Sequence, residues 1–445
     1  MEENKGKRRS HSSAWSFVDD FKGDKIIFMI VLILIMISIL AISSSTPLLA
    51  IQTRSTRSAI IREQVIIAIL GLGLLFVTYQ VSPKILRFIS KYGFVLSLGM
   101  LLCLFVRIKL PFMKAVEING AVRALSIGGF QLHVFEFVKI LMVMYLAWAV
   151  SAYKNDSFKL ANSLSQIDRL SFMEGDFAKK CMYIYGPIIL VAVLIMDGSV
   201  SSMLFIGLVM GVTVLVGGIK IREIIPVLLF AVLVIGLCGG VYFASGKTKF
   251  QRIGTAISRV VMFSQDDEEV LASTRPGTVE FAETLDKVRQ PLGAKVAVME
   301  GRHPKGPGGS TQKYIVPVMF EDYMFSFIVE EYGVLGAIFI LILYGSLLAR
   351  GSRIVRYCDN IYAKTLVAGL VLLIAGQALM HMLINVGLAP MTGQTLPLIS
   401  HGKSSFLAFA IAFGIILGIS KQAEKKLQAD IVPLTIGATE EDTEE

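Results

Sequence analysis

The sequence predicts an all-α, polytopic membrane protein with about ten transmembrane helices and a long extracytoplasmic loop between helices 7 and 8. Of its 445 residues, 54% are hydrophobic and only 17% are charged, and the mean hydropathy is +0.67. That balance is typical of helical membrane proteins rather than of soluble domains. Apolar segments of roughly 17–25 residues recur along the chain, the length needed to cross a bilayer core. Basic residues fall mostly in the short connections between these segments, which is a topology signal.

Each apolar segment is expected to form one span. No strand-like alternation competes with these helices, and no internal repeat is visible. Residues 1–25 contain no cleavage signal before the first apolar run, so they are expected to form a cytosolic tail ahead of an uncleaved first span. Residues 26–421 form the expected transmembrane domain, and residues 422–445 form a second cytosolic tail. The expected spans are 26–49, 59–81, 92–106, 130–151, 181–196, 199–218, 223–245, 322–348, 362–386 and 404–420.

The basic connections indicate the orientation. With ten spans, the basic residues before span one and after spans two, four, six and eight share one side, which the positive-inside rule places in the cytosol together with both termini. Residues 246–321 are then expected to face outward. They are expected to form one or two short helices on the membrane surface, and a flexible linker is the alternative. The formal charge of +9 fits membrane topology better than nucleic-acid binding. Four scattered cysteines favour packing over a disulfide framework.

Several polar residues lie inside expected spans. Glu136 and Lys139 are three residues apart, so they share a helix face and can pair, either as a structural ion pair or as part of a site. Gln377, His381 and Asn385 step by four along one stripe of span nine. Such a stripe is more often used for hydrogen bonding between helices than for metal binding.

Residues 305–336 carry the strongest functional signal. A Gly/Pro-rich turn leads to Glu321 and Asp322, which stand where an apolar helix begins. Carboxylates at such a position are costly to desolvate, which favours a functional role. The alternative for Asp322 is an N-cap of span eight. The turn at residues 306–309 lacks the strand and helix context of a nucleotide-binding loop, so a tight turn is favoured over a phosphate cradle.

These residues resemble motifs of the SEDS family (shape, elongation, division and sporulation proteins, which include FtsW, RodA and SpoVE). Residues 306–333, GPGGSTQKYIVPVMFEDYMFSFIVEEYG, are similar to the family's outer-loop and helix signature. Residues 388–405, LAPMTGQTLPLISHGKSS, resemble its L-P-x-T-G-x-x-L-P-x-I-S-Y-G-G-S-S motif. Residues 119–123, NGAVR, followed by Glu136 and Lys139, form a weaker match. The motifs occur in the family's order over nearly the whole chain.

The chain departs from the family pattern at three places. Ala124 replaces a tryptophan, Val134 and Phe135 replace Pro-Ser, and Lys403 replaces a glycine in the Y-G-G-S-S segment. These changes indicate a divergent member. The tails favour a division-type (FtsW-like) over an elongation-type (RodA-like) protein.

The resemblance implies a peptidoglycan glycosyltransferase of the bacterial cytoplasmic membrane that polymerises lipid II. It places the family's essential aspartate at Asp322, as a general base or as a ligand of a divalent cation (Mg²⁺ or Mn²⁺); no other cofactor is expected. The expected partners are a class B penicillin-binding protein and other membrane proteins of the division or elongation machinery. A lipid II flippase and a non-catalytic scaffold are the alternatives. Expected substrate-binding residues are Arg123, Glu136, Lys139, Lys313, Lys403, Ser404 and Ser405.

Overall fold

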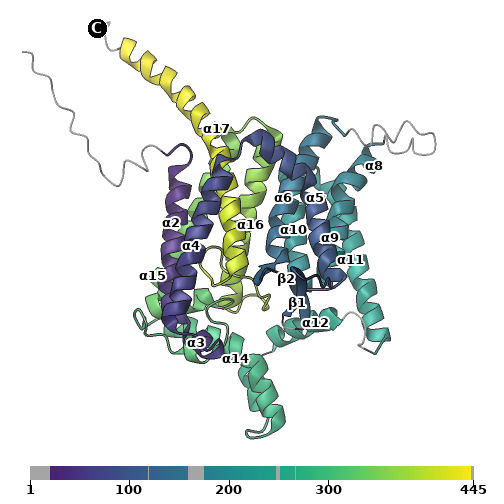
Figure 1. Ribbon diagram of the computed structural model, residues 1–445, viewed down its shortest axis with the longest axis vertical. Helices are drawn as coiled ribbons and strands as arrows, with labels where there is room; N and C mark the ends of the chain where they lie inside the picture. The colour runs from purple at the N-terminus through teal and green to yellow at the C-terminus, as the bar shows by residue number, and fades with distance from the viewer. Residues whose placement is uncertain (1–20, 119, 159–174, 247–250, 266, 442–445) are drawn as a thin grey trace, which may run out of the picture.

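The computed structural model describes residues 21–118, 120–158, 175–246, 251–265 and 267–441. Most of the predicted N-terminal tail, and Asn119 of the NGAVR motif, lie outside these ranges. Within them the protein is a bundle of long apolar helices, which confirms the predicted all-α polytopic membrane fold (Figure 1). Nine of the described helices are long and apolar enough to span a membrane, and a tenth, Val200–Val216, is apolar but shorter.

The first half of the bundle runs from α2 to α11. Asp24 caps α2 by accepting a hydrogen bond from the Ile27 amide at 3.0 Å. The third span is longer than predicted because Ser82 and Pro83 start its helix ahead of the apolar run. The helices are α2 (Lys25–Ser45), α3 (Pro47–Gln52), α4 (Arg57–Gln80), α5 (Pro83–Phe105), α6 (Val134–Lys154), α8 (Asp176–Lys180), the π-helix η2 (Cys181–Tyr185), α9 (Gly186–Met196), α10 (Val200–Val216) and α11 (Ile221–Ala244).

The connection between α5 and α6 contains a small antiparallel sheet that the sequence analysis missed. Its strands are β1 (Met113–Ile118), β2 (Ala121–Ile127) and β3 (Phe130–His133), in the order β1-β2-β3. The predicted fourth span was therefore wrong at its start, since Phe130–His133 is a strand and α6 begins at Val134.

The segment before α15 holds three helices, one more than the upper prediction. These are α12 (Gln251–Ser264), α13 (Asp267–Ala272) and α14 (Val279–Glu300), and a 3₁₀ turn, η3 (Gln312–Tyr314), follows. The last spans are α15 (Met324–Tyr357), α16 (Ile361–Asn385) and α17 (Lys403–Glu441). α15 has one break, at Gly333, where φ is 71°.

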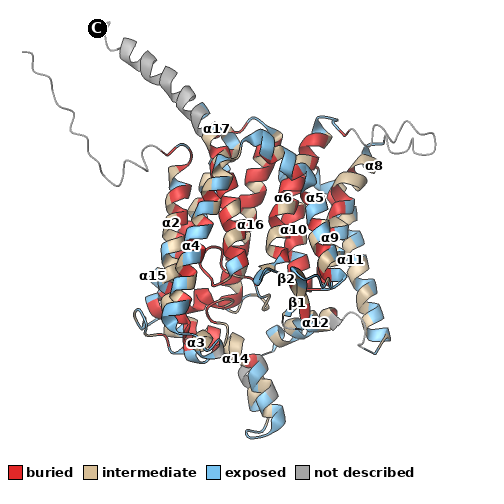
Figure 2. Cartoon of the chain, in the orientation of Figure 1, coloured by how far each residue is buried: buried red, intermediate tan, exposed pale blue. Residues whose placement is uncertain are grey.

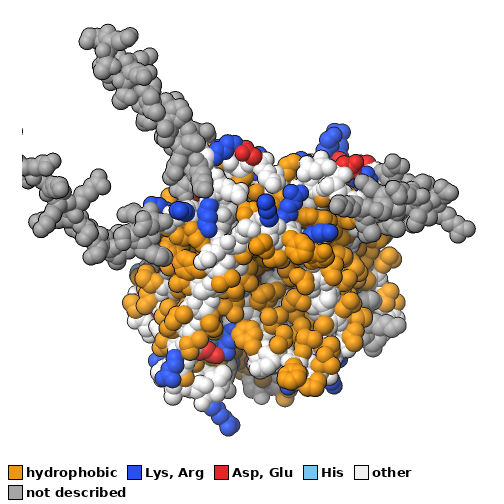
Figure 3. Space-filling model, turned by 45° about the horizontal axis from the view of Figure 1, so that its top comes forward, with side chains coloured by type: hydrophobic (Ala, Val, Ile, Leu, Met, Phe, Trp, Pro, Cys, Tyr) orange, Lys and Arg blue, Asp and Glu red, His pale blue; other side chains and the backbone are white. Residues whose placement is uncertain are grey.

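The buried centre consists of α6, α16 and the first half of α17 (Figure 2). α4 packs along α17 at close range, because any side chain at Gly414 would collide with Thr78. α2 begins and α17 ends at the top of Figure 1, whereas the sheet and α12–α14 gather at the opposite end. Lys and Arg side chains line the edge nearest the termini, above a broad apolar belt (Figure 3).

Candidate active site

Asp322 lies just before α15, in a short turn whose backbone is fixed by three hydrogen bonds from distant segments. The carbonyls of residues 320–322 accept, in order, from the His401 amide at 2.9 Å, Ser400 Oγ at 2.7 Å and Asn385 Nδ2 at 3.0 Å. Because each of three successive peptide groups has its own donor, the turn cannot rotate without breaking one of them. The end of α16 and residues 400–401 thus hold the Asp322 backbone in place.

Asp322 does not cap the helix, so the N-cap alternative is wrong. The N-cap residue of α15 is Tyr323, and no side chain caps this end. The Asp322 carboxylate instead points toward the chain at Gly393: a β-carbon placed on Gly393 would lie 3.7 Å from Asp322 Oδ2. A glycine with φ of 68° at this position lets the backbone approach the acid.

Two arginines set the charge around Asp322. Burial raises the pKa of Asp322 to about 6, and the nearby positive charges of Arg259 and Arg123 oppose that rise. Arg123, on β2, donates through Nε to the Gly198 carbonyl at 3.0 Å. Arg259, on α12, donates through Nη1 to the Met391 carbonyl at 3.3 Å. The two backbone carbonyls therefore orient both guanidinium groups, and the guanidinium charges act on the Asp322 carboxylate.

Glu321 has a different environment from its neighbour. Burial and the adjacent Asp322 charge raise the pKa of Glu321 to about 8. At pH 7 Glu321 is therefore mainly protonated, whereas Asp322 is mainly ionised. Of these two adjacent carboxyl groups, Glu321 can therefore hold a proton while Asp322 can accept one.

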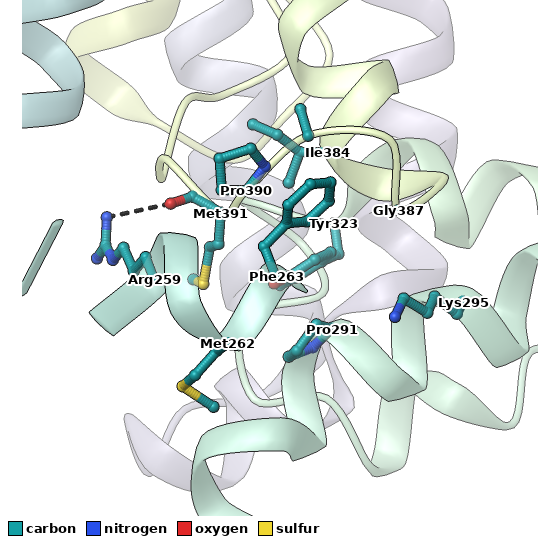
Figure 4. A pocket seen from close by; sticks show the side chains of 11 residues that line it. Arg259, Met262, Phe263, Pro291, Lys295, Tyr323, Ile384, Gly387, Pro390 and Met391 are labelled. Atoms are coloured by element: carbon teal, nitrogen blue, oxygen red, sulfur yellow. Dashed lines mark hydrogen bonds between the residues drawn. The ribbon is translucent and has the colours of Figure 1, made fainter. Parts of the chain in front are cut away.

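A cavity of about 200 Å³ opens beside this turn, between α12, α14 and the loop after α16 (Figure 4). Arg259, Tyr323 and Lys295 contribute its polar groups, and Met391 and Pro390 lie on its loop side. Figure 4 shows the Arg259 guanidinium reaching the Met391 carbonyl at the edge of this space. The cavity gives a bound molecule access to the arginine side of the turn.

The predicted pair of Glu136 and Lys139 forms, with Lys139 Nζ 2.9 Å from Glu136 Oε1. Lys139 also donates to Gln377 Oε1 at 2.5 Å and to Gln394 Oε1 at 3.4 Å. These acceptors surround the buried ammonium, and among the described residues its hydrogen bonds go to Glu136, Gln377 and Gln394 rather than to Asp322. Ser405 Oγ donates to Glu136 Oε2 at 3.1 Å, which extends the network to α17.

The polar stripe of α16 makes the predicted hydrogen bonds between helices. His381 Nδ1 lies 2.7 Å from the Gln394 carbonyl, and Asn385 Oδ1 accepts from the Ser326 amide at 2.9 Å. Together with Gln377 these side chains tie α6, α15 and the loop after α16 into one core. The stripe therefore holds the start of α15, next to Asp322, and the loop after α16 in place.

Ser404 and Lys403 lie at the start of α17, near the sheet and α4. Ser404 Oγ donates to the Gln131 carbonyl at 2.7 Å and accepts from the His133 amide at 3.0 Å, which anchors β3. The Lys403 ammonium pairs with Glu63 on α4. Lys403 remains partly exposed, whereas Ser404 is buried.

Lys313 packs into the Gly/Pro-rich turn, and its ammonium contacts Gly308, Ser44 and Glu331. Its ammonium donates to the Gly308 carbonyl at 2.7 Å and lies 3.5 Å from Glu331 Oε1. The same Glu331 oxygen accepts from the Gly308 amide at 3.0 Å and from Ser44 Oγ at 2.6 Å. The turn does cradle an anion, but that anion is a carboxylate of this chain.

Glu330 holds the other half of the turn. Its Oε1 accepts from the Thr311 amide at 2.6 Å, and its Oε2 accepts from Ser310 Oγ at 2.5 Å. The backbone carbonyls of Glu330 and Glu331, released by the break at Gly333, accept from the Lys305 and Gly306 amides at 3.0 Å each. The outer turn therefore satisfies the hydrogen-bonding groups that the kink in α15 exposes.

Arg259 is the site residue that the sequence analysis did not assign. The signal was present, because Arg252 and Arg259 lie seven residues apart and therefore on one face of an amphipathic helix. Arg252 also acts electrostatically on Arg123 and Arg259. Only the folded chain shows that this basic face turns toward Asp322.

Sequence comparison identifies the family. The profile of the FtsW/RodA/SpoVE cell cycle proteins matches residues 24–425. This chain belongs to that family. The SEDS membership predicted from the motifs, with its FtsW-like character, is therefore confirmed.

Individual relatives agree. The probable peptidoglycan glycosyltransferase FtsW of Bacillus subtilis is 26% identical over 411 residues, covering 90% of this chain and 92% of the relative. A protein of the same description from Hahella chejuensis is 33% identical over 212 residues, which cover 44% of this chain and 51% of that one. A solved structure described as coordinating polymerization and crosslinking in a peptidoglycan synthase complex superimposes with a TM-score of 0.61 at 21% identity, covering 90% of this chain and 98% of that chain. At that identity the match shows the shared fold.

Proposed function

We propose that this chain is a peptidoglycan glycosyltransferase that polymerises lipid II into glycan strands, with Asp322 as the general base. The activity is supported by family membership and by the description of its relatives. The observation that carries the residue assignment is the Asp322 carboxylate itself, fixed through its backbone and flanked by Arg123 and Arg259. A pKa of about 6 leaves this carboxylate ionised at neutral pH yet basic enough to accept a proton.

The proposed reaction joins two lipid-linked sugars. Asp322 takes the proton of a sugar hydroxyl, whose oxygen bonds to the anomeric carbon of the second sugar. The bond between that carbon and the diphosphate oxygen breaks, and the diphosphate leaves with the electron pair. Arg123 and Arg259 would stabilise the charge that develops on the leaving diphosphate, since guanidinium groups match phosphate oxygens in geometry and charge.

The donor set around Asp322 does not fit a divalent cation. Its charged neighbours include two guanidinium groups, which would repel Mg²⁺ or Mn²⁺, and the described residues contain no group of three or more His, Cys, Asp or Glu side chains that could hold a metal ion. The proposed chemistry therefore uses the side chains of this chain alone.

We further propose that both termini face the cytosol and that residues 246–321 face outward. The basic side chains near the termini support this orientation through the positive-inside rule. The proposal puts Asp322 on the side where the lipid-linked sugar is displayed. A class B penicillin-binding protein is the proposed partner, which is supported by the likeness to a chain of a synthase complex.

The test is polymerisation of labelled lipid II by the purified protein together with its penicillin-binding partner. Removing a general base typically costs 10²–10⁴-fold in rate, so Asp322→Asn is expected to lower glycan synthesis at least about 100-fold. Glu117→Gln, on the exposed side of β1, is the matched control and should polymerise at the parent rate. Normal polymer from Asp322→Asn would contradict the assignment, and translocation without polymer would favour the flippase alternative.

A further inference from the structure

A hollow lies where α2, α15 and α17 meet, at the end of the bundle where α2 begins. Arg350, Arg353 and Tyr357 of α15 line one side of it, and Asp24 and Ser420 line the other. The active-site turn precedes the first residue of α15, whereas these residues belong to its last turns. The hollow is therefore a second polar site at the opposite end of the same helix.

The walls of this hollow are held together by Asp24. Its amide donates to Ser420 Oγ at 2.9 Å, which ties the start of α2 to α17. Its Oδ2 accepts from Arg350 Nε at 2.8 Å and lies 2.7 Å from Arg350 Nη2, which ties the same point to α15. Its Oδ1 accepts from the Ile27 amide at 3.0 Å. The carboxylate charge is thus balanced inside a fixed junction of three helices.

Arg353 gives the hollow a net positive charge. Its exposed side chain forms no ion pair with any acidic residue in the described part of the chain. Arg350 uses Nε and Nη2 for Asp24, so its Nη1 stays available, and Tyr357 adds a hydroxyl to the lining. Guanidinium groups match phosphate oxygens in geometry and charge. This set of donors therefore suits a phosphate group.

The face of α15 that carries Arg353 continues toward the middle of the bundle as apolar surface. Ile342 and Phe339 lie about three and about four helical turns before Arg353, and therefore on the same face. They are 57% and 46% exposed, and Phe339 lines an apolar hollow of about 370 Å³ between α15 and α2. Three turns span about 16 Å, close to the roughly 15 Å depth of one hydrocarbon leaflet. An acyl chain attached to a phosphate at Arg353 can therefore lie along this face.

We infer that the hollow binds the phosphate group of an anionic phospholipid, such as phosphatidylglycerol, whose acyl chain lies along α15. Lys and Arg side chains gather at this edge of the bundle, above the apolar belt (Figure 3), which is the level of lipid headgroups. A soluble anion would contact the arginines but leave the apolar face uncovered. With the orientation proposed above, the lipid belongs to the cytosolic leaflet. It joins the start of α2 to the helix that begins next to Asp322.

The site can be tested by native mass spectrometry of the purified full-length protein during titration with phosphatidylglycerol. One molecule per chain is expected to bind more tightly than all others. Arg353→Gln removes a charge-assisted hydrogen bond to the phosphate and should weaken the binding of this molecule at least tenfold. Arg356→Gln is the matched control, because Arg356 is exposed on the same helix but does not line the hollow, and it should bind like the parent.

Further arms separate this site from weaker explanations. Arg353→Lys keeps the charge and should retain part of the affinity, which a misfolded protein would not. Equal losses in Arg353→Gln and Arg356→Gln would overturn the inference, because the lipid would then follow only the overall charge of this edge. Equal affinity for zwitterionic phosphatidylcholine would also overturn it. So would displacement by an equal concentration of glycerol phosphate, which carries the phosphate without acyl chains and would mark a site for soluble anions.

Thermal unfolding gives an independent measurement. A ligand that binds only the folded state stabilises it, so phosphatidylglycerol should raise the unfolding temperature of the parent and of Arg356→Gln more than that of Arg353→Gln. Equal shifts in all three proteins would contradict the inference. The assignment of Asp322 is decided by polymerisation and this site by lipid binding, so either can fail without the other.

Discussion

Glu331 is predicted to hold the outer turn mainly through its ion pair with Lys313. The two side chains are 0% and 4% exposed, and their charged atoms lie 3.5 Å apart. Replacing Glu331 by Gln leaves the ammonium of Lys313 buried without its counter-charge. Removing one partner of a buried ion pair costs about 3–5 kcal/mol, so we expect the free energy of unfolding to fall by that amount.

A double-mutant cycle separates this pair from its surroundings. Lys313→Met alone should cost about 3–5 kcal/mol as well, because it strands the carboxylate. The double variant should lose about as much as one single variant rather than the sum, which corresponds to a coupling of about 3–5 kcal/mol. Glu300→Gln is the control, since Glu300 pairs with Lys305 at 3.7 Å in a partly exposed position and should cost under about 1 kcal/mol.

The assay is equilibrium unfolding of the purified protein in mixed micelles with increasing dodecyl sulfate, followed by tryptophan fluorescence. Costs that add within about 0.5 kcal/mol would refute the reasoning, because they would mean that the two charges do not depend on each other. Equal losses in the Glu300→Gln control would also refute it, since the effect would then be general to acidic residues of the loop.

Two further predictions concern the helices around the site. Gly333→Ala should lower the free energy of unfolding by about 1–3 kcal/mol, because φ is 71° at the break in α15. Gly345→Ala is the control: it lies in regular helix with nothing near its Cβ position, so it should be neutral or stabilising by up to about 1 kcal/mol. Chemical unfolding measures both variants, and equal effects would contradict the account. Asn385→Leu removes the donor to the Asp322 carbonyl and the acceptor of the Ser326 amide, each costing about 1–3 kcal/mol, and we expect glycan synthesis to fall at least about tenfold. Leu379→Ala, on the exposed face of the same helix, should polymerise normally, and a normal rate for Asn385→Leu would show that the Asp322 backbone needs no such support.

The sequence supports the helical architecture well because each span is a long apolar run with polar ends. It locates Asp322, Glu136 and Lys139 through motif and helical spacing. The short strands between α5 and α6 were missed, since strands of four to seven residues lack a pattern strong enough to stand out beside apolar runs.

Other features depend on contacts between distant segments. The position of Lys313 is set by Glu331, eighteen residues later, so its burial could not be inferred from its own surroundings in the sequence. The same holds for Arg259, whose charge acts on Asp322 although α13 and α14 separate the two residues in the sequence. Local periodicity shows that α12 is amphipathic, but only tertiary packing decides which partner its basic face meets.

The pH dependence of glycan synthesis tests the central claim most directly. An ionised Asp322 with a pKa of about 6 predicts a rate that is level near pH 7.5 and falls about tenfold per unit well below pH 6. Because the charge of Arg259 lowers the pKa of Asp322, Arg259→Gln should move this acid limb to higher pH. An unshifted limb in that variant, or a rate that rises as the pH falls from 7 to 5, would contradict the account.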